Sequence, residues 1–335
     1  MSETVHTIEH AAVTVVIPVW NSGAWIPDCL KGLAQQTFQD FSIVLVDNGS
    51  TDGSVDRLRA QCPANLNVIS FPVNQGFAVA VNKGIRSATA KYVVLLNVDT
   101  IAEPQWLTEL VRVMEQCPED VGALASGMVR MDNPDLVDDA GDILSWYGSA
   151  SKRGHGKPVQ EYQQQDEVFS VCAGAALFRK DFFDQVGLFD ERFVSYLEDI
   201  DLCLRGKIAG YKYIYVPTAR VLHEGHSAGV VGSYYAYLMT RNRLMTLLKN
   251  IPCRLLFRNL HQILYGQVYF FLVYRKPFAS LRGYFSLLCQ LPHILRSRSD
   301  ILKKKQDIRQ LSDSLLSSEL GEPSLMAMVK RKLRL

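Results

Sequence analysis

The chain has 335 residues, of which 48% are hydrophobic and 21% are charged, and its net charge is +2. This composition excludes a disordered chain and provides enough apolar material for one large domain with an appendage. The charge is unevenly distributed. Residues 1–240 carry 18 Lys and Arg against 29 Asp and Glu, a net charge of −11, whereas residues 241–335 carry 18 against 5, a net charge of +13. An acidic body therefore precedes a strongly basic tail.

The first 125 residues alternate between short apolar runs and amphipathic stretches. The apolar runs predict strands at residues 13–18, 43–46, 66–71, 92–96 and 121–125, and the amphipathic stretches predict helices at 25–36, 54–61, 77–88 and 106–116. Strands and helices that alternate with short connections are typical of a mostly parallel sheet covered on both faces. We therefore predict an α/β fold.

Residues 131–167 form a long polar segment with an Asn-Pro pair and several Gly. A segment of this kind inside a compact domain is usually functional or disordered. Within it we interpret Lys152 and Arg153 as solvated charges, although they could contact a phosphate group of a substrate. The apolar runs at 169–178 and 212–216 predict two further strands.

The composition changes beyond residue 234. Residues 255–295 are rich in Leu, Phe and Tyr with interspersed Arg and Lys, and the longest uncharged stretch, 259–274, has 16 residues. About 20 are needed to span a bilayer. The pattern favours amphipathic helices in the membrane interface, attracted to anionic lipid, over an ordinary helical subdomain packed on the body. We divide the chain into a domain at 1–240 and a basic, aromatic-rich helical region at 241–335.

The N-terminus and the cysteines indicate the compartment. Residues 1–10 are polar, and the apolar run that follows has only the length of a strand, so we expect no secretory signal. The seven Cys are scattered without a C-x-x-C pair. This pattern is typical of reduced thiols in a cytoplasmic protein.

Asp47 follows the buried strand at 43–46 and precedes an Asn-Gly turn. At the carboxyl edge of a sheet, a carboxylate can accept hydrogen bonds from a ribose or a base N–H. The alternative is that Asp47 only caps the turn, but a turn alone needs no acid at the end of a buried strand. The glycine-rich patterns G-x-G-x-x-G and G-x-x-x-x-G-K-[ST] are both missing from the sequence, so a dinucleotide fingerprint and a phosphate loop are not expected.

Asn97 and Asp99 follow the strand at 92–96, and alternation along a strand would put both on one face with Val98 toward the core. Oxygen ligands there suit Mg²⁺ or Mn²⁺ bridging a diphosphate. His223 ends the apolar run 219–222. We interpret it as a further metal ligand, in preference to His226, although a lone His is more often structural.

Glu198 and Asp199 lie near a predicted helix start, where the helix dipole favours negative charge. One of these carboxylates could act as a general base that takes the proton of an attacking sugar hydroxyl. The alternative is a solvated acidic first turn in which Asp201 and Arg205 form an i,i+4 pair.

Taken together, these motifs resemble glycosyltransferase family 2, the inverting enzymes of GT-A fold, and in particular the rhamnosyltransferase-like members that build bacterial cell-surface polysaccharides. The resemblance covers residues 13–250. It rests on the motifs at 16–21, 46–53, 74–78, 82–84, 96–99, 187–193, 198–202 and 223–227.

The resemblance implies roles for individual residues. Asp199 would be the catalytic base, Glu198 would hold the acceptor or orient the base, and Asp99 and His223 would bind Mn²⁺ or Mg²⁺. The nucleotide-sugar donor would be bound by Pro18, Asn21, Asp47, Asn48, Asn74, Gly76, Lys83, Asn97 and, at the diphosphate, Arg205. The family's metal motif often begins with Asp, or reads Asn-Pro-Asp in the rhamnosyltransferase-like branch. Here it reads Asn97-Val98-Asp99, which should weaken metal affinity without abolishing it.

The resemblance implies transfer of a sugar such as rhamnose from a dTDP- or UDP-linked donor to a glycan or polyprenyl-linked acceptor. This reaction would take place on the inner face of the plasma membrane, in polysaccharide or lipopolysaccharide synthesis. A catalytically inactive nucleotide-binding scaffold and a nucleotidyltransferase remain alternatives, although the second would normally need a basic glycine-rich loop near the first strand. We expect no nucleic-acid partner. The sequence leaves the sugar, the linkage and the oligomeric state open.

Overall fold

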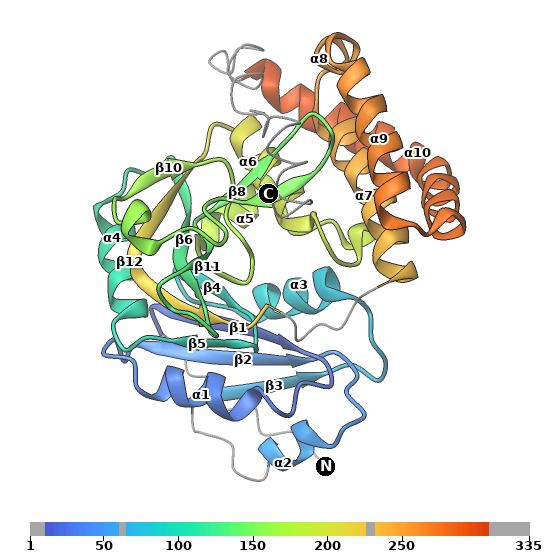
Figure 1. The fold of residues 1–335 in the computed structure, drawn as a ribbon. Coiled ribbons are helices and arrows are strands. Elements are labelled where there is room, and N and C mark those ends of the chain that lie inside the picture. Colours follow the sequence, from blue (N-terminus) through green and yellow to red (C-terminus); the bar gives the residue numbers. More distant parts are fainter. Residues whose placement is uncertain (1–10, 60–64, 226–231, 308–335) are drawn as a thin grey trace. The chain divides into compact units, whose positions relative to one another are not determined.

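A computed structural model describes residues 11–59, 65–225 and 232–307 (Figure 1). His226 and the basic residues beyond 307 lie outside this part of the chain. The fold divides into two compact units. The first comprises the described residues of 1–142, 152–207 and 211–230, and the second those of 143–151, 208–210 and 231–335. The division that we placed at residue 240 falls inside helix α7 (Ser233–Asn250).

The first unit is built on a ten-stranded sheet with the order β10-β12-β6-β11-β4-β1-β2-β3, to which β5 and β7 add at β12 and β6. Its strands are β1 (Val13–Val19), β2 (Phe41–Asp47), β3 (Leu66–Ser70), β4 (Tyr92–Leu96), β5 (Thr100–Ala102), β6 (Val121–Arg130), β7 (Val137–Asp139), β10 (Asp166–Val168), β11 (Ala175–Arg179) and β12 (Lys212–His223). β3, β2, β1 and β4 run parallel, and β12 runs parallel to β6. β11 enters antiparallel between β4 and β6. The predicted α/β sheet is confirmed.

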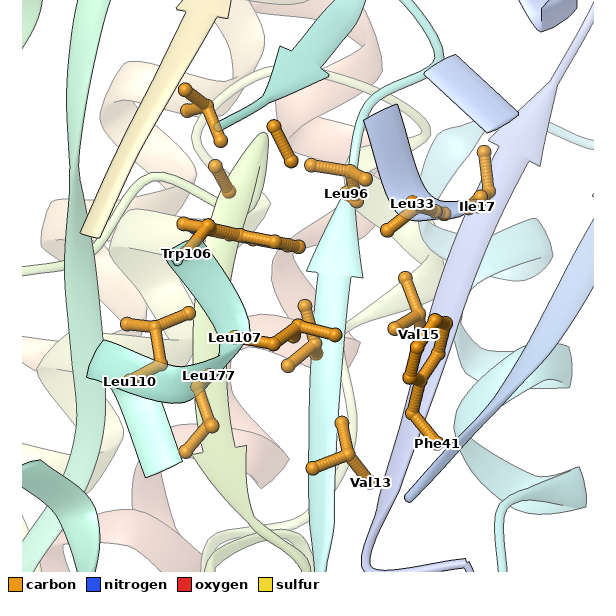
Figure 2. Packing of buried hydrophobic residues seen from close by; sticks show 14 of the residues in the cluster. Val13, Val15, Ile17, Leu33, Phe41, Leu96, Trp106, Leu107, Leu110 and Leu177 are labelled. Carbon is orange, nitrogen blue, oxygen red and sulfur yellow. The ribbon is translucent and has the colours of Figure 1, made fainter. Parts of the chain in front are cut away.

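Helices cover both faces of this sheet. They are α1 (Ile26–Ala34), α2 (Ser54–Arg59), α3 (Phe77–Ser87), α4 (Trp106–Gln116), α5 (Lys180–Val186) and α6 (Glu198–Ile208), with short 3₁₀ turns η1 (Val159–Tyr162) and η2 (Glu191–Phe193). Val13, Val15 and Ile17 of β1 pack with α1 and α4 in one apolar cluster (Figure 2). Val16 points the other way, toward α3, because side chains alternate along a strand. A Cβ on Gly84 of α3 would lie 2.2 Å from Val16 Cγ1, so only glycine permits this approach.

Two predicted segments differ from the structure. The polar segment at 131–167 is ordered and contains β7, β8 (Asp142–Leu144), β9 (Ala150–Lys152), η1 and β10. The predicted strand at 169–178 is shorter, because β11 begins only at Ala175. The residues before it form a turn in which Ala175 N donates to Cys172 O. Val171 and Ala173 are buried there without belonging to a strand, so burial alone explains their apolar character.

The described C-terminal part of the second unit, from residue 233 on, is helical, as predicted for the C-terminal region. It contains α7, α8 (Cys253–Arg258), α9 (Leu260–Tyr274) and α10 (Pro277–Asp307). Close approaches again fall at glycines. A Cβ on Gly266 of α9 would lie 2.6 Å from Tyr147 O, and one on Gly283 of α10 would lie 2.7 Å from Tyr237 O of α7. Among the described helices, none is both long and apolar enough to cross a membrane.

Candidate functional site

Asp47 is the last residue of β2, and its side chain is buried. Its Oδ1 accepts a hydrogen bond from Ser50 N at 2.9 Å, and its Oδ2 accepts one from Ser70 Oγ at 3.1 Å. The carboxylate therefore does cap the following turn, which was the alternative interpretation. Each carboxylate oxygen has a second lone pair, so a role in binding a ribose or a base is compatible with the cap and stays a prediction.

The loops beside Asp47 are tied together by amide side chains. Asn21, whose φ of 48° is left-handed, accepts from Thr51 N at 2.8 Å through Oδ1. Asn48 Oδ1 accepts from Gln75 N at 2.8 Å, and Asn48 Nδ2 donates to Asn74 Oδ1 at 3.1 Å. Asn48 therefore links the loop after β2 to the loop before α3. Contact of these residues with a nucleotide stays a prediction.

Gly76, Pro18 and Lys83 are three further residues expected at the nucleotide. Gly76 precedes α3 with a φ of 93°, and a Cβ there would lie 2.8 Å from Val194 Cγ1. Pro18 lies opposite Val46 of β2, near the end of β1. Lys83 is exposed on α3.

Asp99 and His223 come together although 124 positions separate them in the sequence. β5 pairs antiparallel with β12, which sets His223 opposite Thr100. His223 Nε2 then lies 3.4 Å from Asp99 Oδ2, and both side chains are buried. Carboxylate oxygen and imidazole nitrogen at this separation can bind one cation, since ligand distances of about 2.0–2.2 Å to each atom are compatible with it. The predicted metal pair is therefore geometrically fit for an ion such as Mn²⁺.

The second ring nitrogen of His223 is also bound. Its Nδ1 lies 2.7 Å from Asp138 Oδ2. Burial by itself lowers the pKa of His223, but the hydrogen bonds to Asp138 and Asp99 outweigh it and raise the pKa to about 9. Asp138 also accepts from Lys152 Nζ at 2.6 Å. Lys152 is thus two-thirds buried in an ion pair, which corrects our interpretation of it as a solvated loop charge.

Asn97 lies in a turn rather than on an extension of β4, so the argument from strand alternation does not apply to it. Its N donates to Gly174 O at 2.8 Å, and Thr100 Oγ1 donates to Asn97 O at 2.6 Å. Val98 is buried, as predicted. The turn delivers Asp99 to His223.

Glu198 and Asp199 open α6, as predicted. Asp199 Oδ1 accepts from Ile200 N at 2.8 Å, and Asp199 Oδ2 accepts from Ala173 N at 3.4 Å. Burial raises the pKa of Asp199, and burial followed by repulsion from Asp199 raises the pKa of Glu198 well above its usual range. Carboxylates with raised pKa values are suited to proton transfer near neutral pH.

The backbone that leads into this acidic pair is strained. Val194, Tyr196 and Leu197 all have φ values between 67° and 71°, in the left-handed region that non-glycine residues rarely adopt. Strain of this kind is retained where the surrounding structure fixes it, often at functional sites.

A further acidic group lies close to Asp199. Asp139, Asp142 and Cys172 each offer one potential ligand atom, and these atoms lie within 4.8 Å of one another. Burial raises the pKa of Asp139 to about 6, and it raises that of Asp142 well above its usual range, with repulsion from Asp199 contributing to both. These residues could not be grouped from the sequence, because no recognisable ligand spacing links Asp139 and Asp142 to Cys172.

Arg205 is held inside the fold. Its Nε donates to Asp201 Oδ2 at 3.0 Å, and its Nη1 and Nη2 donate to the carbonyl oxygens of Val186 and Leu188, each at 2.7 Å. The i,i+4 pair of the alternative interpretation is therefore present, but it is buried rather than solvated. A contact of Arg205 with the diphosphate stays a prediction.

Comparison with known proteins shows the family of this chain. Residues 14–187 match the model of the family described as glycosyl transferase family 2. The N-acetylglucosaminyl-diphospho-decaprenol L-rhamnosyltransferase of Mycobacterium tuberculosis is 29% identical over 245 residues, which cover 65% of this chain and 79% of that protein. The pre-mycofactocin glycosyltransferase of the same organism is 29% identical over 217 residues, which cover 64% of this chain and 43% of that protein.

Solved structures share the fold. GalNAc-T7, solved with UDP, GalNAc and Mn²⁺, superimposes with a TM-score of 0.58 and 16% identity over 72% of this chain and 48% of its own. The mannosyltransferase PcManGT from Pyrobaculum calidifontis, solved with GDP-Man and Mn²⁺, superimposes with a TM-score of 0.52 and 17% identity over 96% of this chain and 87% of its own. The family model spans more than half of the chain, so this protein belongs to glycosyl transferase family 2 and has the GT-A fold.

Proposed function

We propose that this glycosyltransferase moves a sugar, with inversion, from a nucleoside diphosphate to a lipid-linked glycan on the cytoplasmic face of the membrane. Use of a nucleotide-sugar donor follows from the family. Rhamnose is the sugar that we favour, since the mycobacterial relative is named for its transfer. The pathway we propose is the synthesis of a cell-surface polysaccharide such as lipopolysaccharide.

The observation that carries the proposal is the meeting of Asp99 with His223, 3.4 Å apart, at the edge of the sheet where β2 also delivers Asp47. Ligands of open α/β sheets bind at the carboxyl ends of the strands. Asp99 and His223 would hold Mn²⁺ or Mg²⁺, which when bound neutralises the charge of the leaving diphosphate. Asp47 would orient the nucleoside.

Asp199 acts as the general base in this proposal. Its raised pKa makes it a stronger proton acceptor than an ordinary carboxylate, and its two backbone hydrogen bonds fix its position. It takes the proton of the acceptor hydroxyl as the hydroxyl oxygen bonds to the anomeric carbon. The bond from that carbon to the diphosphate breaks on the opposite face. A single displacement of this kind inverts the anomeric configuration.

Thermal unfolding with UDP, dTDP, GDP and CDP, each with and without Mn²⁺, tests donor binding. A ligand that binds only the native state raises the melting temperature. At a concentration one hundred times its Kd, it adds about 2.7 kcal/mol to the free energy of unfolding. We expect one nucleotide to stabilise the protein strongly only when Mn²⁺ is present. No metal-dependent shift with any of the four would contradict the metal site and would favour the inactive scaffold. Transfer of the nucleoside monophosphate from the donor, with release of sugar 1-phosphate instead of nucleoside diphosphate, would favour a nucleotidyltransferase.

The acceptor side of the proposal is supported by the second unit. Large apolar side chains recur at intervals of three, four or seven residues along α9 and along α10 and are exposed: Leu260, Leu264, Val268, Leu272, Phe278, Leu281, Phe285, Leu288 and Leu295. We call this set the apolar stripes. Residues 251–299 contain seven Lys and Arg and no Asp or Glu. Exposed apolar residues among purely positive charges suit an anionic lipid surface, where each basic residue contributes about 1 kcal/mol.

Sedimentation with phosphatidylglycerol-containing vesicles tests this docking. Phe278→Glu/Phe285→Glu places two charges in the apolar stripes at side chains that are 87% and 68% exposed, so the fold should tolerate them. We expect this variant to lose most of its vesicle binding. The matched control, Gln35→Glu/Gln116→Glu, adds the same charge at exposed positions of the first unit and should bind as the unmodified chain does. Equal binding by all three proteins would contradict membrane docking through α10.

A further inference from the structure

We propose that Asp138 is a positioning residue, which fixes the protonated nitrogen and the ring orientation of His223 so that Nε2 faces the cation held with Asp99. This inference rests on the metal site of the proposed function. Sequence analysis did not indicate this role, because Asp138 lies in the polar segment at 131–167, far along the chain from the predicted site residues.

The geometry distinguishes the two nitrogens of the ring. Nδ1 lies 2.7 Å from Asp138 Oδ2, whereas Nε2 lies 3.4 Å from Asp99 Oδ2. An imidazole that binds a cation through Nε2 must carry its remaining proton on Nδ1. A carboxylate is the acceptor that best retains this proton, and it also increases the basicity of the liganding nitrogen. Asp138 occupies that position.

Asp138 has two further partners besides His223. Lys152 Nζ donates to Oδ2 at 2.6 Å, and His155 Nδ1 lies 2.9 Å from the backbone oxygen of Asp138. The side chains of Asp138 and His223 are each only 7% exposed. In such surroundings charged hydrogen bonds are strong and leave the ring little freedom to rotate.

Asp138 is not itself a ligand in this arrangement. Its bonded oxygen contacts the Nδ1 edge of the ring, while the cation site lies at the Nε2 edge beside Asp99. Its effect on the cation therefore passes through His223. We therefore expect replacement of Asp138 to weaken cation binding only when His223 is present.

Binding of Mn²⁺ to the full chain, followed by the electron paramagnetic resonance of the free ion, tests this dependence. We expect Asp138→Asn to weaken Mn²⁺ binding by about 10- to 100-fold. In a His223→Ala background, Asp138→Asn should cause no further loss. Asp135→Asn, an exposed carboxylate in the same segment, is the matched control and should leave the affinity unchanged. Thermal unfolding without Mn²⁺ checks that each variant is folded.

Three results would overturn the inference in different ways. Equal Mn²⁺ affinity of Asp138→Asn and the unmodified chain would remove the positioning role alone. The same loss in both backgrounds would show a general structural effect. Failure of the unmodified chain to bind Mn²⁺ would overturn the proposed metal site itself. If Asp138→Asn does not fold, nitrogen-15 resonances of His223 in the unmodified chain with Mg²⁺ decide the matter, since a proton on Nε2 instead of Nδ1 contradicts the inference.

Discussion

Asp138 and His223 are 85 positions apart in the sequence, yet Asp138 Oδ2 and His223 Nδ1 lie 2.7 Å apart. β6 brings them together. It pairs with β7 on one stretch of its length and with β12 along the other edge, so that His223 lies opposite Arg130 and Asp139 lies opposite Met128. The site therefore depends on the register of three strands, and changes in these strands should affect metal binding as well as stability.

Removal of either metal ligand should abolish the effect of the metal on nucleotide binding without abolishing the binding itself. In Asp99→Asn and His223→Ala we expect the extra stabilisation of the nucleotide by Mn²⁺ to disappear, because each variant loses one of the two facing ligand atoms. Stabilisation without metal should remain, since Asp47 is unaffected. Thermal shifts with and without Mn²⁺ measure this. An unchanged Mn²⁺ effect in both variants would place the cation elsewhere, for instance at Asp139, Asp142 and Cys172.

Gly84→Ala should destabilise the first unit. The added Cβ would lie 2.2 Å from Val16 Cγ1, and both residues are buried between α3 and β1. Overpacking of this kind costs about 1–3 kcal/mol, which urea unfolding can measure.

Lys83→Ala on the exposed face of the same helix is the control for helix propensity and should change stability by less than about 0.5 kcal/mol. Adding Val16→Ala to Gly84→Ala should recover part of the loss, because the clashing methyl groups are removed. A full loss that persists in the double variant would mean that α3 does not approach β1 at this point.

Asp199→Asn should remove most turnover while leaving donor binding nearly intact. The amide keeps the size of the side chain but cannot accept the proton of the acceptor hydroxyl, and general-base catalysis contributes about 10²–10⁴-fold. Steady-state rates, with nucleotide-induced thermal shifts as the measure of donor binding, check both parts. Asp201→Asn is not a suitable control, because Asp201 is paired with buried Arg205. Asp190→Asn, at the cap of η2, changes a nearby carboxylate outside the acidic pair and should retain turnover.

The fold was accessible from the sequence because its signals are local. Apolar runs ending in Asp47 and Asn97 predicted β2 and β4, and the pattern at Glu198 predicted the start of α6. The motifs also pointed to the pair Asp99 and His223, although their contact depends on the pairing of β5 with β12. β5 has only three residues, too few for a periodic pattern to be recognised.

What surrounds the pair could not be predicted in this way. The polar composition of the segment at 131–167 indicated a loop, yet it contains Asp138, Lys152 and His155. These residues contact one another only because β7 pairs with β6. Arg205 shows the opposite case, since its i,i+4 spacing predicted Asp201 as its partner, but not the two carbonyl oxygens that complete its contacts. Long-range contacts between irregular segments leave no periodicity in the sequence.

The pH dependence of turnover should reveal the raised pKa of Asp199. The base must be deprotonated to act, so turnover is lost as the pH falls through this pKa. Because burial raises it, the acidic limb of kcat/KM should lie above the value of about 3.9 for an ordinary Asp. Far-UV circular dichroism at each pH separates this limb from acid unfolding. A rate that stays constant down to about pH 4 in folded protein would contradict the assignment of Asp199 as the base.

Lys152 supplies a directional test of the same limb. Its positive charge lowers the pKa of Asp199, so Lys152→Met should raise that pKa and move the acidic limb to higher pH. Lys157→Met removes an exposed charge from the same segment and should leave the limb in place. Lys152 also anchors Asp138, so the profiles are measured at saturating Mn²⁺, where weaker metal binding changes the apparent metal affinity rather than the midpoint. If the acidic limb instead moves to lower pH in Lys152→Met, the group that controls turnover is not a carboxylate close to Lys152, and the assignment to Asp199 is contradicted.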